Sequence, residues 1–263
     1  MKVVVCVKYV PDAQSQRTFS ADHTAERASV DGLLSELDEY AVEEALTIAE
    51  DAGEGQVIVL TMGPEEAATA IKKSLQMGAH EGVHINDEAI AGSDSIATSL
   101  VLAAAVGKLG EDEPVDLVLT GLASTDAVMS VVPAMLAERL GLPQVTFASE
   151  LTVQDGAVTI RRDGDVASET IRASLPAVVS VTDQINEPRY PSFKGIMAAK
   201  KKPVQTWSLA DLGVDAGQVG LDAAWTRVVS VDEAPPRSQG EIVTDEGQGG
   251  RALADFLTAR KFA

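Results

Sequence analysis

Cysteine and histidine are scarce in this sequence of 263 residues, which contains one cysteine and three histidines. The single thiol, Cys6, excludes an intramolecular disulfide framework and is typical of a reducing compartment, so we expect a cytoplasmic location. The histidines are His23, His80 and His84. Their spacing matches no metal-binding pattern, and we interpret all three as surface or loop residues.

Long apolar runs and an excess of positive charge are also absent. No window approaches the roughly 18 uncharged apolar residues of a membrane span, so we expect no membrane insertion. The first ten residues, MKVVVCVKYV, lack the basic start and cleavage site of a secretory signal. Because 40 acidic residues outnumber 21 basic ones, the chain repels phosphate backbones, and we do not expect nucleic acid as a partner.

Catalytic motifs are missing too. No GxSxG, HExxH or CxxC occurs. We interpret the carboxylate pairs Glu43-Glu44 and Glu65-Glu66 as hydrated helix faces. Cys6 lies within a buried strand pattern, which is typical of an inert thiol. The sequence therefore predicts no catalytic residues and no enzymatic activity of its own.

Strand-like runs alternate with helical patterns up to about residue 147. This alternation predicts βαβ units and an α/β, Rossmann-like, mostly parallel sheet with helices on both faces. The helix that begins near Ser35 shows a capping-box pattern, with Asp38 three residues on. From residue 150 to 173 the pattern changes to period two around Asp155-Gly156, which predicts inserted β-hairpins. The expected strands are at 3–7, 56–63, 81–85, 115–121 and 143–148, with another in the run LPAVVSVTD after the hairpins.

The pattern weakens after residue 203. No comparable periodic core follows until RALADFLTARKF, residues 251–262, which has the spacing of a short amphipathic helix. A Pro-Pro pair and the run DEGQGG lie between, and such a segment cannot bury itself. We therefore predict an α/β domain over residues 1–203 and an extended C-terminal arm over residues 204–263.

Two glycine-bearing loops follow predicted strands, at the edge where open parallel sheets bind ligands. The longer loop, GLASTDAVMSVVP, contains the small or polar residues Gly121, Ala123, Ser124, Thr125, Asp126 and Ser130. If Ser130 caps the next helix, Pro133 falls in its first turn, and the free N–H groups there would suit a phosphate. The alternative is a plain strand-to-helix loop. Neither GxGxxG after the first strand nor a P-loop is present.

A basic island stands out in a chain of formal net charge −19: residues 187–203 read EPRYPSFKGIMAAKKKP. Its apolar residues are Tyr190, Phe193, Ile196 and Met197, and its lysines are Lys194 and Lys200 to Lys202. One interpretation buries the apolar side chains within the molecule and leaves the lysines solvated. The other is a docking loop, in which an aromatic anchor enters a partner's pocket while the lysines steer toward carboxylates. Composition leaves both interpretations open.

Several long motifs resemble the electron transfer flavoprotein β subunit. They are VKYVPD, LDEYAVEEAL, GPEEAATAIKKSLQMGA, GLASTDAVMSVVPAMLAERLGLPQVTFASEL and INEPRYPSFKGIMAAKKKP. The resemblance implies a nucleotide-α-hydrolase-like sheet in one half of an α/β heterodimer. This heterodimer carries electrons on an FAD held mainly by the α subunit, and the terminal helix of the β subunit packs on that partner. Electrons would pass from acyl-CoA and related dehydrogenases of fatty acid oxidation, through FAD, to a quinone-linked oxidoreductase.

By motif position, the resemblance also implies a structural AMP in the β subunit, or in a variant a second FAD. The implied cofactor-binding residues are Cys6, Ser35, Leu37, Asp38, Met62, Gly121, Ser124, Thr125, Asp126, Ser130, Val131 and Val132. The sequence departs from many relatives at Ala127-Val128-Met129, where they carry a polar loop. It departs again at Ala13, where some relatives place an aromatic residue near the isoalloxazine.

The basic island corresponds in this resemblance to the family's recognition loop, residues 189–198, which anchors partner dehydrogenases. The implied docking residues are Arg189, Tyr190, Phe193, Lys194, Ile196, Met197, Lys200 and Lys201. Phe193 is the implied anchor, at a position where other members carry leucine. The alternative function is a stand-alone adenine-nucleotide-binding module of the stress-protein kind, which would need neither the arm nor the docking loop.

Overall fold

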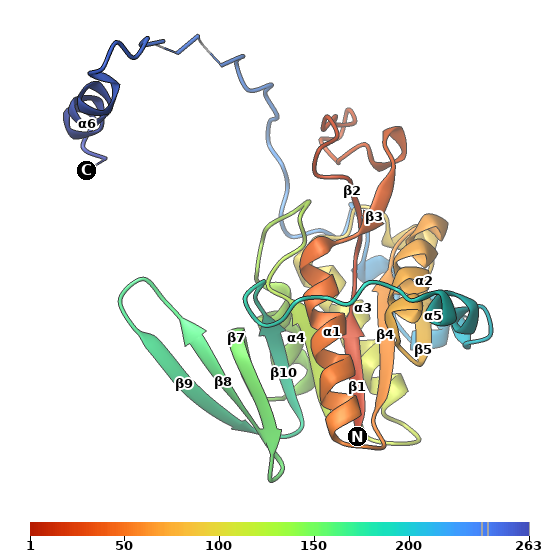
Figure 1. Ribbon diagram of the computed structural model, residues 1–263. Helices are drawn as coiled ribbons and strands as arrows, with labels where there is room; N and C mark the ends of the chain where they lie inside the picture. Colours follow the sequence, from red (N-terminus) through yellow and green to blue (C-terminus); the bar gives the residue numbers. More distant parts are fainter. Residues whose placement is uncertain (238, 241, 263) are drawn as a thin grey trace. The chain divides into compact units, whose positions relative to one another are not determined.

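The computed structural model describes residues 1–237, 239–240 and 242–262. The chain forms two units, Met1–Val229 and Ser230–Ala263. The first unit contains the sheet and five of the labelled α-helices, and the second contains α6 (Gly249–Ala259) (Figure 1). Among the helices of the described residues, none is both long and apolar enough to cross a membrane.

A nine-stranded sheet runs through the first unit in the order β11-β5-β4-β1-β6-β10-β7-β8-β9. Neighbours from β11 to β7 pair in parallel, and β8 and β9 extend the sheet in antiparallel fashion. The strands are β1 Lys2–Cys6, β4 Gln56–Met62, β5 Glu81–Ile85, β6 Leu117–Gly121, β7 Gln144–Gln154, β8 Ala157–Asp163, β9 Ser168–Ser174, β10 Ala177–Val181 and β11 Val204–Trp207. The predicted mostly parallel α/β sheet with a hairpin insertion is confirmed.

Helices cover both faces of the sheet because strand side chains alternate between the two faces. Val3 and Val5 of β1 pack in one core cluster with α1 and α2, whereas Val4 packs in the other with α3 and α4. The helices are α1 Glu36–Asp51, α2 Ala68–Met77, α3 Ser95–Leu109 and α4 Val132–Leu140. Two apolar layers therefore hold a sheet whose strands are buried on both sides.

Two connections of the first unit have a defined local structure. Between β1 and α1, strands β2 (Tyr9–Pro11) and β3 (Gly32–Leu34) form a separate antiparallel pair. The β7–β8 turn has positive φ at both Asp155 and Gly156, 51° and 68°, as a tight hairpin turn requires.

Residues 182–203 form a strap that crosses α1 (Figure 1). The strap includes α5 (Phe193–Ala199), which packs on α2. Arg189 of the strap pairs with Glu43, and Asn186 donates to Glu44. Both carboxylates are buried. The interpretation of Glu43-Glu44 as a hydrated helix face is therefore wrong, because the strap covers that face.

The chain after residue 203 returns to the sheet before it leaves the first unit. β11 pairs in parallel with β5, and Trp207, Leu209 and Val219 join the core cluster beneath α3. Residues 204–229 therefore belong to the first unit, whereas the sequence placed the start of the arm at residue 204. A strand of four residues with one buried side chain leaves little periodicity to detect.

Candidate functional site

The strand order reverses at β1, because β4 and β5 lie on one side of it and β6 and β10 on the other. Open parallel sheets bind ligands beyond the carboxyl ends of strands at such a switch point. Cys6, Met62 and Gly121 are the last residues of β1, β4 and β6, so the structure brings these predicted site residues to one edge.

The start of α1 closes against this edge at Gly121. A Cβ added there would lie 2.7 Å from the carbonyl oxygen of Leu37 and 2.7 Å from Oδ1 of Asp38. Only glycine allows this approach. The structure therefore places two more of the predicted residues, Leu37 and Asp38, directly beside the end of β6.

Asp38 joins the two central strands through its buried carboxylate. Oδ2 accepts a hydrogen bond from the backbone N–H of Lys8 at 2.8 Å, and the N–H of Gly121 also bonds the carboxylate. Burial outweighs these bonds and raises the pKa of Asp38 to about 7. The predicted capping box is wrong, because Asp38 faces β1 and β6 and Ser35 makes no side-chain cap bond.

Ser35 is the N-cap residue of α1, and its side chain is buried without a hydrogen-bond partner among the described residues. A buried hydroxyl without a partner is costly, so such groups usually mark a bond made to something else. The position lies at the start of a helix of 16 residues, beside the switch point. Ser35 is therefore a suitable contact for a bound polar ligand.

Asp126 organises the loop after β6 through ion pairs. Its side chain is 3% exposed and accepts hydrogen bonds from Lys8 Nζ, at 3.0 Å, and from the Arg27 guanidinium. Burial alone would raise the pKa of Asp126, but the charge of Lys8, the hydroxyl of Ser124 and the charge of Arg27 hold it well below its usual range. Desolvation lowers the pKa of Lys8, against the opposing charge of Asp126.

Three segments are thus joined at one carboxylate: the end of β1, the connection at residue 27 and the loop after β6. Sequence reasoning missed Lys8 and Arg27. Lys8 lies in the motif VKYVPD, which signalled the family but not this contact. Arg27 lies in a polar connection that has no periodic pattern.

The same loop holds apolar side chains in an unusual backbone conformation. Val128 and Ser130 have φ of 50° and 55°, and left-handed backbone is rare for a β-branched residue. The side chain of Val128 is largely exposed, as is Met129. Strained backbone and exposed apolar groups together are typical of a contact surface. The predicted cap at Ser130 is wrong, because Val131 is the N-cap and the helix begins at Val132.

Cys6, His80 and His84 make contacts that belong to the fold. Burial, with the charge of Asp38, raises the pKa of the Cys6 thiol to about 12, which fits an inert thiol. His84 is buried and bonds the carbonyl of Gly63, and His80 Nδ1 accepts from the N–H of Val57. The prediction that His84 lies at the surface is wrong. No group of metal-binding side chains occurs within the described ranges.

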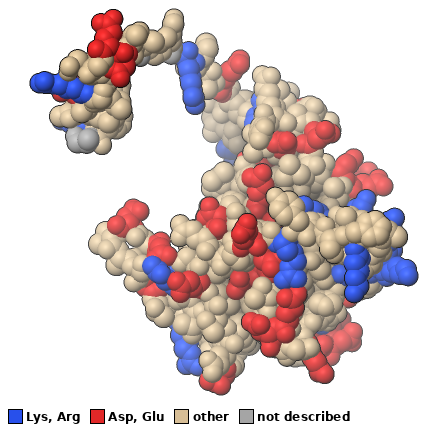
Figure 2. All heavy atoms as spheres, in the orientation of Figure 1, with Lys and Arg blue, Asp and Glu red and all other residues tan. Residues whose placement is uncertain are grey.

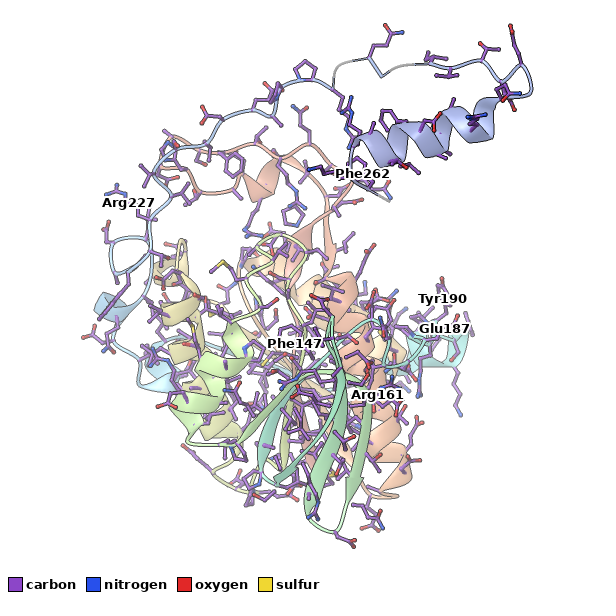
Figure 3. The ribbon with its side chains drawn as sticks, turned by 90° about the vertical axis from the view of Figure 1, so that its left-hand side faces the viewer. Phe147, Arg161, Glu187, Tyr190, Arg227 and Phe262 are labelled. Atoms are coloured by element: carbon purple, nitrogen blue, oxygen red, sulfur yellow. The ribbon has the colours of Figure 1, made fainter. Side chains whose placement is uncertain are left out.

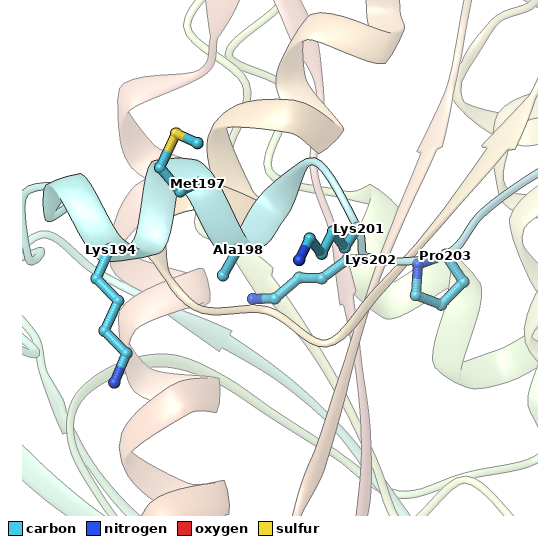
Figure 4. A pocket seen from close by; sticks show the side chains of 6 residues that line it. All are labelled: Lys194, Met197, Ala198, Lys201, Lys202 and Pro203. Atoms are coloured by element: carbon cyan, nitrogen blue, oxygen red, sulfur yellow. The ribbon is translucent and has the colours of Figure 1, made fainter.

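A second surface lies on the strap, at the side of the molecule where Figure 2 shows basic side chains grouped. Tyr190 and Phe193 are 92% and 80% exposed, and Tyr190 lies at the periphery in Figure 3. A shallow depression beside them is lined by Lys194, Met197, Ala198, Lys201, Lys202 and Pro203 (Figure 4). The predicted docking residues Lys194, Met197, Lys200 and Lys201 are exposed, whereas Ile196 is half-buried.

Two cations of the strap are engaged within the chain. Lys202 Nζ donates to the carbonyls of Leu75, Gly78 and Ala79, at 2.5 to 3.0 Å, and so caps the C-terminal end of α2. The expectation that Lys202 steers a partner is therefore wrong. Arg189 is bound by carboxylates of α1.

The switch-point edge and the exposed strap are the two candidate contact surfaces of this α/β domain. Comparison with protein families matches residues 22–212 to the electron transfer flavoprotein domain. The chain is 47% identical to electron transfer flavoprotein subunit beta of Mycobacterium bovis, over 98% of each chain. It is 31% identical to the protein of the same name in Megasphaera elsdenii, over 100% of this chain and 98% of the relative.

A further relative is the caffeyl-CoA reductase-Etf complex subunit CarD of Acetobacterium woodii, 34% identical over 93% of this chain and 92% of the relative. The chain belongs to the electron transfer flavoprotein family. The resemblance found in the sequence motifs is confirmed. Membership of this family indicates that the protein is an electron carrier.

Proposed function

We propose that this chain is the β subunit of a heterodimeric electron transfer flavoprotein. It passes electrons from acyl-CoA and related dehydrogenases, through FAD at the interface with an α subunit, to a quinone-linked oxidoreductase and so to the respiratory chain. The proposed location of the heterodimer is the cytoplasm. The observation that carries the proposal is the 47% identity to a β subunit over 98% of both chains.

FAD supplies the electron chemistry when it is bound, and the part of this chain is to cover it. The connection between β1 and α1, together with Leu37, is the segment proposed to close over the flavin. Lys8 and Arg27 hold this connection to Asp126, so its position is set before any partner binds.

We also propose a structural AMP at the switch point. The residues fit a nucleotide in one respect: the Ser35 hydroxyl, at the start of α1, is buried without a hydrogen-bond partner among the described residues. The N–H groups at the start of α4 suit a phosphate, although Pro133 supplies none. Lys8, Arg27 and the Ser124 hydroxyl already bind Asp126, so phosphate recognition rests on backbone groups and on Thr125 and Ser130.

The partner surfaces follow from the exposed apolar groups. Leu253 and Phe256 of α6 are exposed, and we propose that they pack on the α subunit. Tyr190, Phe193 and Met197 of the strap are proposed to dock dehydrogenases, with Lys194 and Lys201 steering toward carboxylates.

Co-expression with an α subunit tests this function. The expected product is a yellow heterodimer that releases one FAD and one AMP on denaturation, measured by absorbance and chromatography. A colourless chain that remains alone and retains ATP would identify a stand-alone nucleotide module. Two FAD molecules per heterodimer would retain the carrier function and overturn the AMP assignment.

A further inference from the structure

Arg189 is the most extensively bonded side chain of the strap. Its Nε donates to Oε2 of Glu43 at 2.8 Å, its Nη2 donates to Oε1 of Glu43 at 2.9 Å, and its Nη1 donates to Glu50 at 2.7 Å. Its backbone N–H also donates to Glu43, at 3.0 Å. Both the main chain and the side chain of one residue are therefore fixed to α1.

The geometry requires a guanidinium. Glu43 and Glu50 are seven residues apart, two turns along the same face of α1, and a planar fork of donors can reach both. The ammonium of a lysine is a single point of charge and cannot span two carboxylates in this way. Because the Glu43 side chain is 10% exposed, the pair is shielded from solvent at this carboxylate.

Other contacts fix the strap on either side of Arg189. Asn186 donates to the carbonyl of Tyr40 at 3.1 Å and to Glu44 at 3.0 Å. Gly195 lies so close to α2 that a Cβ would be 2.6 Å from the carbonyl oxygen of Gln76. At the far end, Lys202 caps α2.

The residues next to these contacts are free. Tyr190 follows Arg189 directly and Phe193 lies four residues beyond Arg189, yet both side chains are almost fully exposed. The backbone is thus held while the apolar side chains stay available. A loop that is already ordered loses less conformational freedom on binding than a flexible one, and it binds more tightly for the same contacts.

We propose that Arg189 is a positioning residue, which orders the strap so that Tyr190 and Phe193 meet the electron donor in a single conformation. The proposal rests on the docking role given above. It removes Arg189 from the docking contacts implied by the family resemblance and assigns it a role through its neighbours.

The test uses the complete heterodimer carrying Arg189→Ala or Arg189→Lys. Arg162→Ala is the matched control, because Arg162 has the same 35% side-chain exposure and pairs with Glu169 on the hairpin. Hydrogen exchange of the Gly195 and Ile196 amides, which bond to Ser192, reports on the order of the strap. Flavin content, thermal unfolding and electron transfer from a donor dehydrogenase are measured on the same samples.

We expect exchange at these amides to accelerate at least about tenfold in Arg189→Ala, with a smaller change in Arg189→Lys and none in Arg162→Ala. The apparent KM for the donor rises several-fold in both Arg189 variants, while the maximal rate and flavin content stay unchanged. The lysine variant keeps the charge, so a KM change in it depends on the fork and not on net charge.

Unchanged exchange in Arg189→Ala would overturn the proposal, and so would faster exchange with an unchanged KM. Phe193→Ala separates this outcome from a failure of the docking role. If Phe193→Ala raises KM and Arg189→Ala does not, the positioning role of Arg189 is refuted and the docking role of the strap stands. If neither variant changes KM, the docking role of the strap is refuted as well.

Discussion

The strap and the C-terminal segment both expose apolar side chains, but they differ in what holds their backbone. The strap, residues 182–203, is bonded to α1 and α2 by Asn186, Arg189 and Lys202. The described part of the C-terminal segment after Val229 contains one helix, α6, and its exposed apolar residues include Ile242, Leu253 and Phe256. The strap therefore presents its apolar side chains from a backbone that is bonded to two helices, whereas α6 presents them from a single helix.

The difference indicates two kinds of partner contact. An isolated helix of 11 residues is marginal in water, so the α-subunit contact proposed for α6 would also stabilise the helix itself. Such a segment suits a permanent partner, because the ordering cost falls once, at assembly. The strap is ordered in advance, which suits partners that bind and leave repeatedly.

The largest expected effect comes from charging α6. Leu253→Asp with Phe256→Asp places two carboxylates on the apolar face, and we expect binding to the α subunit to weaken by more than about 30-fold, or about 2 kcal/mol. Affinity measured with an immobilised α subunit tests this. Thr258→Asp is the control with equal charge per substitution. Unchanged affinity in the double variant would remove the distinction between the two regions.

A smaller effect is expected from Phe193→Ala in the strap. We expect loss of this anchor to cost up to about 2 kcal/mol of donor binding, as for a hot-spot residue, whereas flavin content and unfolding temperature stay unchanged because the side chain is exposed. Stopped-flow transfer from a dehydrogenase measures the effect. Val166→Ala, at a still more exposed apolar residue of the hairpin, is the control. Equal rates in both variants would count against the docking role.

Much of the fold could be predicted because its determinants are local. The β-branched runs of β1, β4 and β6 predicted these strands, and the glycine-bearing loop after β6 was expected at the ligand-binding edge because it follows a strand. Cys6 and Met62 were assigned to this site only by motif position in the family resemblance. Period-two alternation likewise located the hairpins. These patterns arise from burial of each segment against the sheet, and that burial is written in the segment itself.

Several errors arose where two distant segments meet. Glu43 looked solvent-facing because its partner, Arg189, lies 146 residues further along the chain. Asp126 bonds Arg27 across 99 residues, and neither residue has a periodic neighbour that reveals the contact. Ion pairs of this kind leave no local pattern in the sequence. Only the folded structure identifies the contact of Arg189 with Glu43 and the contact of Arg27 with Asp126.

The smallest expected effect concerns acid, and it separates the strap from α6 by chemistry. The hydrogen bond from Arg189 lowers the pKa of Glu50 below its ordinary value of 4.5, in spite of slight desolvation. A carboxylate whose pKa is lower in the folded than in the unfolded chain contributes its full stabilisation when the pH lies above the unfolded pKa. This contribution is lost as the pH falls through the folded pKa. The strap should therefore loosen below about pH 4.5, whereas apolar contacts of α6 do not titrate.

Carboxyl carbon titration by NMR measures this directly. In Arg189→Ala we expect the pKa of Glu50 to return toward its ordinary value. Burial raises the pKa of Glu44, which bonds Asn186 instead, and this value serves as the internal control because it should not follow Arg189. An unchanged Glu50 titration in the variant would show that the guanidinium does not hold this carboxylate in solution, and the claim that Arg189 spans both Glu43 and Glu50 would be refuted.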